Sequence, residues 1–210
     1  MRNVTLSVRL ALAAGLTLTA IALGLVLTQT PLVLAGTNGV PANFAVTFLH
    51  RGGTLCQRGG TLPAGTVAIR VSLSANAGPG VSLQAFSGSR TIAAGERGAG
   101  WGTDETITVP VARVARTVGD ARVCVTVGQA AEPIQVNGAR VQTAGGGEVV
   151  WLRLEYLRHG AGSWASLAAS VAHRIGLAHA PGGTWVVFPL LAAMLAVCVF
   201  VSRLILSDLR

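Results

Sequence analysis

Side chains that can do chemistry are sparse in the middle of this chain. Its acids are scattered, and the one adjacent pair is Asp104 and Glu105. Neighbouring residues on a strand point to opposite faces, so this pair does not form a two-carboxylate site. His173 and His179 are six residues apart, which fits neither one helix face nor a usual zinc pair. No hydrolase, metalloprotease or phosphate-binding motif is present. The sequence therefore predicts a protein that is not an enzyme and that holds no metal or cofactor.

Two tryptophans near charged residues are the candidates for ligand binding. Trp101 lies in a glycine-rich loop with Arg97 and Asp104 nearby, and Trp151 comes two residues before Arg153 in an expected strand. A tryptophan in such a loop can serve as a platform on which a sugar ring or a proline stacks. The alternatives are that Trp101 folds over the end of the core and that a loop covers Trp151.

The cysteines indicate a disulfide bond. Cys56 and Cys124 both lie in the part of the chain expected outside the cell, where disulfides form and persist. Such a bond would stabilise the domain by roughly 2–4 kcal/mol. The valines around Cys124 alternate with it, which puts the cysteine on the outer face and predicts a bond across the outside of the sheet. Cys198 falls in the last apolar run and is expected to be an ordinary apolar helix residue.

The pattern from residue 44 to residue 158 predicts an all-β domain. Short apolar alternations are broken by Gly, Pro, Asn and Asp, as in strands with one buried face. Eight or nine short strands are too many for one open sheet of this length, so we expect a two-sheet β-sandwich of immunoglobulin-like or jelly-roll-like type. The strands are expected near 44–49, 67–73, 81–86, 90–94, 106–111, 121–127, 133–141 and 148–157.

Asn137-Gly138 predicts a tight hairpin turn within this domain. This dipeptide supplies the two positive-φ positions of a type I′ turn. The turn would pair Val136 with Ala139 and leave Arg140 outside.

An uncharged run at the C-terminal end, residues 184–202, predicts a transmembrane helix. About 19 residues at 1.5 Å rise cover roughly the 30 Å of a bilayer core. Trp185 stands at one end as an interfacial aromatic, while Arg203 and Arg210 follow the other end as cytoplasmic charges. The helix is therefore expected to run from outside to inside.

A second apolar run, Leu10 to Leu27, follows Arg2 and Arg9. It fits either an uncleaved membrane anchor, which we favour, or a secretory signal cut at Ala35-Gly36. In both cases the chain starts in the cytoplasm and the residues after 36 are exported. With the C-terminal helix, this places both termini in the cytoplasm and the β domain outside the plasma membrane.

Residues 163–177 change to a helical period, with Ser163 as N-cap. A membrane-surface helix is expected here, and docking against the sandwich is the alternative. The expected interface residues are Trp164, Leu167, Val171, Ile175 and Trp185.

Four regions follow from these patterns: an anchor or signal at 1–36, the β-sandwich at 37–160, the amphipathic helix and linker at 161–183, and the last helix and tail at 184–210. The net charge is +8, and all sixteen basic residues are arginine. They are spread singly, without a nucleic-acid motif, so nucleic acid is not an expected partner. Arginine without lysine indicates GC-rich coding and hence a bacterium.

Three stretches in the C-terminal part resemble membrane-anchored exported β-sandwich proteins of high-GC actinobacteria. They are residues 153–158, then Ser163-Trp164, then 182–185 leading to 202–204. The resemblance brings no activity and no site residues with it. More generally, the sandwich is similar in fold to immunoglobulin-like and carbohydrate-binding modules.

Two functions are consistent with this organisation. The favoured one is a non-enzymatic envelope protein that acts as an accessory subunit, with membrane lipid and another integral membrane protein as partners. Small residues spaced four apart, as at Ala11 and Gly15, offer helix-packing faces that favour it. The alternative is a tethered carbohydrate- or ligand-binding module that meets envelope glycan.

Overall fold

The computed structural model describes residues 2–41, 44–101, 106–130, 132–142 and 148–174, and beyond these only 193, 196, 198–200 and 203. The chain forms two units. One consists of Met1–Pro31 with Gly160–Arg210 and contains helices, and the other is the β unit, Leu32–His159. The first strand thus begins before the domain boundary expected after residue 36.

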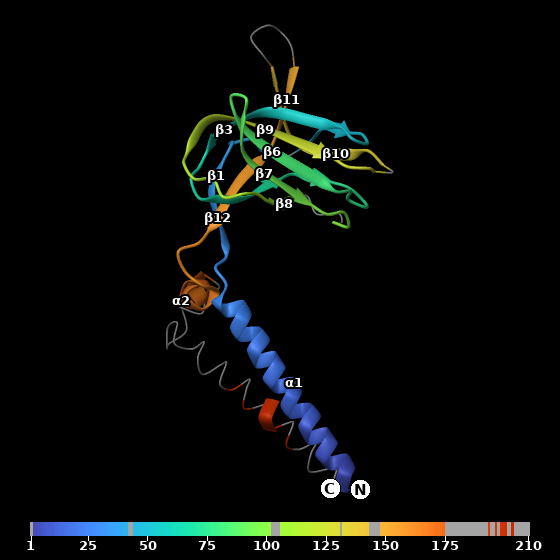
Figure 1. Ribbon diagram of the computed structural model, residues 1–210, viewed down its shortest axis with the longest axis vertical. Coiled ribbons are helices and arrows are strands. Elements are labelled where there is room, and N and C mark those ends of the chain that lie inside the picture. The colour runs from blue at the N-terminus through green and yellow to red at the C-terminus, as the bar shows by residue number, and fades with distance from the viewer. Residues whose placement is uncertain are drawn as a thin grey trace. The chain divides into compact units, whose positions relative to one another are not determined.

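Twelve strands are described in the β unit (Figure 1). They are β1 (Leu32–Thr37), β2 (Phe44–Leu49), β3 (Thr54–Leu62), β4 (Thr66–Val71), β5 (Leu73–Ser74), β6 (Val81–Ser87), β7 (Arg90–Arg97), β8 (Ile107–Pro110), β9 (Val118–Val127), β10 (Ile134–Gln142), β11 (Glu148–Leu152) and β12 (Leu154–His159).

The strands pair into three sheets around one core. Sheet A has the order β1-β12-β4-β8, sheet B has the order β11-β10-β2 with β5 also on β10, and sheet C has the order β3-β9-β6-β7. Sheets A and B are continuous along the chain, because β4 leads into β5 and β11 leads into β12. The mainly β, sandwich-like fold is confirmed. The largest fully buried side chains come from all three sheets and include Tyr156, Leu62, Ile69, Leu73, Leu83, Ile107, Ile134, Leu152 and Leu154.

Two amide side chains, of which Gln57 is buried and Asn38 half-buried, hold the point where the last strand passes from sheet B to sheet A. The Gln57 side chain donates to the Leu152 carbonyl at 2.6 Å and accepts from the Leu152 N–H at 2.5 Å. Asn38 donates to the same carbonyl at 2.7 Å and accepts from the Leu154 N–H at 3.0 Å. A strand that changes sheets loses ladder partners, and these side chains supply replacements. We call residues 152–154 the strand switch.

The predicted hairpin at Asn137-Gly138 is wrong, because β10 runs without a turn from Ile134 to Gln142. Gly138 instead serves a close backbone approach, since a Cβ atom there would lie 1.9 Å from the carbonyl oxygen of Trp151. Asn137 donates its N–H to Ser72 at 3.0 Å. Its carbonyl accepts from Arg153 at 3.4 Å. The dipeptide that indicates a turn therefore lies where β10 meets both bends that join sheets A and B.

Two strands occupy segments that the sequence predicts as irregular. β1 contains Ala35 and Gly36 and pairs with β12, so a cut at the expected signal site would remove most of this strand. β3 contains Gly59 and Gly60 and is absent from the expected strands, and its register with β9 shifts around Gly60. Gly60 has a φ of 71° and Asp120, on the opposite strand, has a φ of 52°. Both conformations are typical of bulges, which allow glycines inside a strand.

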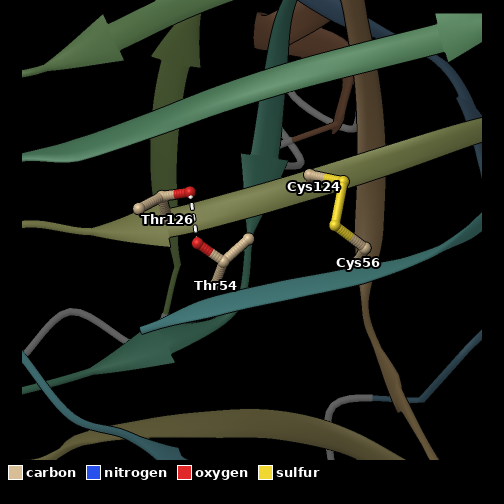
Figure 2. The surroundings of a disulfide bond; sticks show 4 residues. All are labelled: Thr54, Cys56, Cys124 and Thr126. Carbon is tan, nitrogen blue, oxygen red and sulfur yellow. Dashed lines mark hydrogen bonds between the residues drawn. A yellow bond between two sulfur atoms is a disulfide. The ribbon is translucent and has the colours of Figure 1, made fainter. Parts of the chain in front are cut away.

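The Cys56–Cys124 disulfide is confirmed (Figure 2). The two cysteines lie directly opposite each other on β3 and β9, on the outer face of sheet C. Cys124 alternates with the buried Val123 and Val125, as expected. We expected the bond to hold the Cys56 segment across the outside of the sheet, but this segment is itself β3, the strand next to β9. Thr54 and Thr126, two residues along the same pair of strands, share a hydroxyl hydrogen bond of 2.8 Å.

The predicted pair of flanking transmembrane helices is wrong for the part of the chain that the structure describes. No helix there is both long enough and apolar enough to cross a membrane. α1 (Arg2–Thr28) is 27 residues long and includes Arg2 and Arg9. Its charge-free run, from Leu10 to Thr28, is 19 residues long. The second expected span, 184–202, falls almost wholly outside the described residues.

The second described helix, α2 (Trp164–Arg174), begins at the predicted N-cap, because the Ser166 N–H donates to the Ser163 hydroxyl at 3.3 Å. The Trp164 N–H donates to the carbonyl of Gln29 at 3.0 Å, which bonds the start of α2 to the end of α1. Trp164 and Val171 are exposed and Leu167 is half-buried. Ile175 and Trp185 lie outside the described residues. Contact of these five residues with a membrane surface stays a prediction.

Candidate functional site

A line of polar side chains crosses the outer face of sheet A. Four strands contribute one residue each, and the register places Thr37 opposite Glu155, Glu155 opposite Arg70, and Arg70 opposite Thr108. We call these four residues the polar row. Side chains directly opposite on neighbouring strands lie about 4.5–5.5 Å apart at Cβ, so they can bond to one another.

Glu155 is the centre of the polar row. Its Oε2 accepts from Nη1 of Arg70 at 3.1 Å, and its Oε1 accepts from Nη2 and Nε of Arg153 at 2.6 and 3.0 Å. The carboxylate side chain is 13% exposed, whereas Arg70 and Arg153 are 38% and 35% exposed. A guanidinium has five N–H donors. Both arginines are therefore fixed at the carboxylate and keep further donors for solvent or a ligand.

Arg97 joins the polar row from β7. Its Nη1 donates to the carbonyl of Thr108 at 3.3 Å, and the hydroxyl of the same threonine accepts from Nε of Arg70 at 3.4 Å. The structure thus connects Arg97 and Arg153, two of the residues expected at a binding site, through three residues that the sequence did not single out.

Trp151 lies on the same outer face. Trp151, Arg153 and Glu155 are half-buried and alternate with the fully buried Leu152 and Leu154. The alternation of a strand places the first three on one side, as expected.

Trp151 has exposed apolar neighbours. It stands opposite Ala139, and the next residues on that face are Val141 and Val149, which are 45% and 43% exposed. An indole ring and two valines therefore continue the polar row into sheet B.

Trp101 does not form a binding platform. Trp101 is 4% exposed, and its indole N–H donates to the carbonyl of Pro79 at 2.7 Å. The ring packs on Gly78, where a Cβ atom would lie 2.0 Å from it. Trp101 therefore closes the end of the core, which is the alternative weighed above. Asp104 lies outside the described residues.

Sequence alternation could have found part of this site. It places Glu155 outward beside Arg153, and Arg70 outward on its own strand, but it does not show that these two strands pair. Beneath the row, burial raises the pKa of Tyr156 from 10.0 to about 12, because the tyrosinate would lose its hydration in the core. Within the described ranges, no three His, Cys, Asp or Glu residues are placed to hold a metal ion.

The row offers hydrogen-bond donors around one carboxylate, with an aromatic ring at one end. Ionised carboxylates have about four acceptor positions, and three at Glu155 are taken by arginine donors. The arrangement suits recognition of a polar ligand that has both an apolar face and hydroxyl groups.

No protein-family model and no curated protein matches this chain. Among solved structures, the chain is similar to a β-1,3-glucan-binding CBM6 from Bacillus halodurans, with 10% identity and a TM-score of 0.30 over 63% of this chain and 97% of the other. It is also similar to CsCBM6-3 from Clostridium stercorarium, a structure in complex with cellobiose, with 8% identity and a TM-score of 0.28 over 62% and 93% of the two chains. With both TM-scores this low, the likeness is a weak one.

Proposed function

We propose that the β unit is a non-catalytic binding module whose ligand is a carbohydrate. The observation that carries this proposal is the half-buried indole of Trp151 on the same face as the guanidinium groups that Glu155 holds in place. A sugar ring has an apolar C–H face, which stacks on an aromatic ring, and a rim of hydroxyl groups, which bond to charged donors and acceptors.

The fixed geometry supports this function. Arg70 and Arg153 already make hydrogen bonds of 3.1 Å or less to Glu155. Their remaining donors therefore lose little conformational freedom when a ligand binds. A sugar whose ring lies on Trp151 would place its hydroxyls toward Arg153 and, further along the row, toward Arg70. Thr37 and Thr108 add backbone and hydroxyl groups at the two ends.

A protein partner is the second candidate. The exposed side chains of Val141 and Val149 beside Trp151 favour it, because exposed apolar groups around an aromatic residue are common at protein interfaces. Such a partner would bury the valines, whereas a sugar on the polar row needs only the indole and the charged groups.

We also propose that the β unit works outside the cytoplasm. The Cys56–Cys124 bond supports this location, since disulfides are maintained in oxidising compartments. An envelope or secreted glycan would then be the accessible ligand.

The test is binding of the full chain to an array of neutral and acidic oligosaccharides, followed by calorimetry on the saccharide that binds best. Trp151→Ala is expected to weaken this binding at least about tenfold, because an aromatic contact of ~1.5 kcal/mol corresponds to roughly a factor of ten. Trp164→Ala, in α2, is the matched control and should leave the affinity unchanged. Circular dichroism checks that both variants are folded.

Two results would contradict the proposal. One is the absence of any saccharide binding, and the other is a folded Trp151→Ala protein with unchanged affinity. If Val141→Asp disrupts a complex isolated with the chain while saccharide binding is absent, the protein-partner function is favoured.

A further inference from the structure

Two adjoining cavities lie on either side of the connection between β8 and β9. The first, of about 350 Å³, is lined by Arg113, Arg158 and His159 among others. The second, of about 400 Å³, is lined by Arg90 and Arg116 among others. Both include Val114 and Ala115, so the two cavities share one wall. Neither contains a residue of the polar row or Trp151. We call them together the arginine groove.

Among the residues that the structure describes, no acidic side chain compensates the charge of the arginine groove. Neither cavity has a described Asp or Glu in its lining. Among the described residues, Arg90, Arg113, Arg116 and Arg158 make no ion pair and no side-chain hydrogen bond. Several other arginines of the β unit do make such contacts, as Arg97 does with Thr108 and Arg70 does with Glu155. Four like charges without partners destabilise the folded chain by repulsion, so their convergence indicates a site for negative charge.

The backbone that carries Arg113 and Arg116 is fixed. Val114, between them, is 3% exposed and bonds on both sides, donating to Thr66 at 2.9 Å and accepting from Gly65 at 2.8 Å. Ala112 donates to Ala94 at 3.2 Å. The guanidinium groups therefore extend from a rigid segment, which lowers the entropy cost of binding.

From this arrangement we propose that the arginine groove binds an acidic polysaccharide, one that carries carboxylate or phosphate groups on neighbouring units. The planar fork of arginine matches both groups with two parallel hydrogen bonds. Two cavities with arginines in each accommodate at least two anionic groups. The described residues of the lining include no Phe, Tyr or Trp. Nucleic acid is disfavoured, because single strands bind largely by stacking bases on aromatic rings. This site is separate from the face of the proposed function.

The probe is a fluorescently labelled oligogalacturonate, with binding to the full chain measured by anisotropy at several salt concentrations. It should bind, and the uncharged oligogalactose of the same length should not. Competition by tripolyphosphate, compared with competition by unlabelled oligogalacturonate, distinguishes phosphate from carboxylate. The anion that the groove prefers displaces the probe at the lower concentration. A single-stranded oligonucleotide that competes better than both would overturn the proposed ligand class.

The decisive variant is Arg113→Gln with Arg116→Gln, one arginine from each cavity. We expect at least about tenfold weaker binding, since each charge-assisted hydrogen bond contributes roughly 1.5 kcal/mol or more, and a shallower dependence on salt. The control is Arg51→Gln with Arg58→Gln, which removes the same charge from residues that line neither cavity. Its affinity should change less than about twofold. Equal losses of affinity in the two double variants, or no loss in either, would show that the anion does not bind in the arginine groove.

Both arginine pairs are exposed, so the variants are expected to fold, and circular dichroism checks this. Should the first variant unfold, Arg90→Gln with Arg158→Gln again removes one arginine from each cavity and must give the same tenfold loss.

Discussion

Two adjacent residues of β12, Glu155 and Tyr156, have different surroundings: the first is a paired charge on the outer face, and the second is a polar aromatic residue in the core. Glu155 has a side chain that is only 13% exposed, and Arg70 and Arg153 hold it. A buried carboxylate that loses such partners leaves an uncompensated charge, which costs several kcal/mol. Tyr156, the next residue, points the other way and is fully buried. Adjacent positions on β12 therefore place a paired charge on the outer face and an aromatic ring in the core.

Because of Tyr156, the stability of the fold is expected to decrease with rising pH in the alkaline range. Burial raises its pKa to about 12. Between pH 10 and 12 the unfolded chain therefore gives up the phenolic proton while the folded chain keeps it. Stability is fully present below pH 10 and should fall by about 2–3 kcal/mol as the pH rises to 12.

Urea unfolding across this pH range measures the effect, and absorbance at 295 nm follows the proton directly. The chain has a single tyrosine and no lysine, so few other groups titrate there. Tyr156→Phe should remove the slope between pH 10 and 12 whatever its stability at neutral pH. A slope that persists in this variant would show that another group is responsible.

Among the elements, β10 contacts both bends that join sheets A and B. Residues 135–136 of β10 pair with β5, and residues 138–142 pair with β11. Asn137 lies between these two stretches, and its backbone is hydrogen-bonded to the backbones of Ser72 and Arg153. The side chains of Asn38 and Gln57 both donate hydrogen bonds to the Leu152 carbonyl in the strand switch. The bend between the sheets is therefore held by backbone approach and by amide side chains, which no local pattern of the sequence indicates.

Gly138→Ala should destabilise the β unit by at least about 3 kcal/mol. A Cβ atom there would lie 1.9 Å from the carbonyl oxygen of Trp151, so β10 and β11 would have to separate. Gly119→Ala, in β9, is the matched control, because a Cβ atom there meets nothing within 4 Å. Its effect should stay within about 0.5 kcal/mol. Equal stability of the two variants in urea unfolding would contradict the close approach at Gly138.

Over the whole β unit, strands far apart in sequence depend on one another. β1 and β12 come from its two ends and pair in sheet A. All three sheets contribute side chains to a single hydrophobic core. The disulfide adds a covalent link between β3 and β9, which are 68 residues apart at the cysteines. Cross-links that close so long a loop restrict the unfolded chain the most.

Replacing both cysteines, as Cys56→Ser with Cys124→Ser, should lower the stability of the β unit by about 2–4 kcal/mol without changing its fold. Serine is accommodated because Cys56 is exposed and Cys124 half-buried. The measurement is urea unfolding of the full chain, with Cys198→Ser as the control that leaves the disulfide intact. Reductant should lower the free energy of unfolding of the control to that of the double variant. A double variant as stable as the untreated control would show that the bond contributes nothing to stability.

Local pattern was enough for several features. Alternation over residues 121–127 and 150–156 correctly separates inward from outward side chains, and an even pair of cysteines in a region expected outside the cell predicts the disulfide. Ser163 is recognisable as an N-cap from its neighbours alone. These features depend on residues close in sequence, or on compartment chemistry, and so need no knowledge of which strands pair. The apolar runs predicted membrane helices on length and charge alone, and this expectation is corrected for the part of the chain that the structure describes.

Tertiary structure alone decided the rest. Asn137-Gly138 indicates a turn locally, yet the approach of Trp151 makes glycine necessary within a strand. Trp101 has the same glycine-rich neighbours whether it is exposed or packed on Gly78. The polar row and the arginine groove each combine residues from distant strands, and strand pairing follows from burial of one shared core. The sequence by itself determined which face of each strand is apolar, whereas long-range packing determined which outer residues meet.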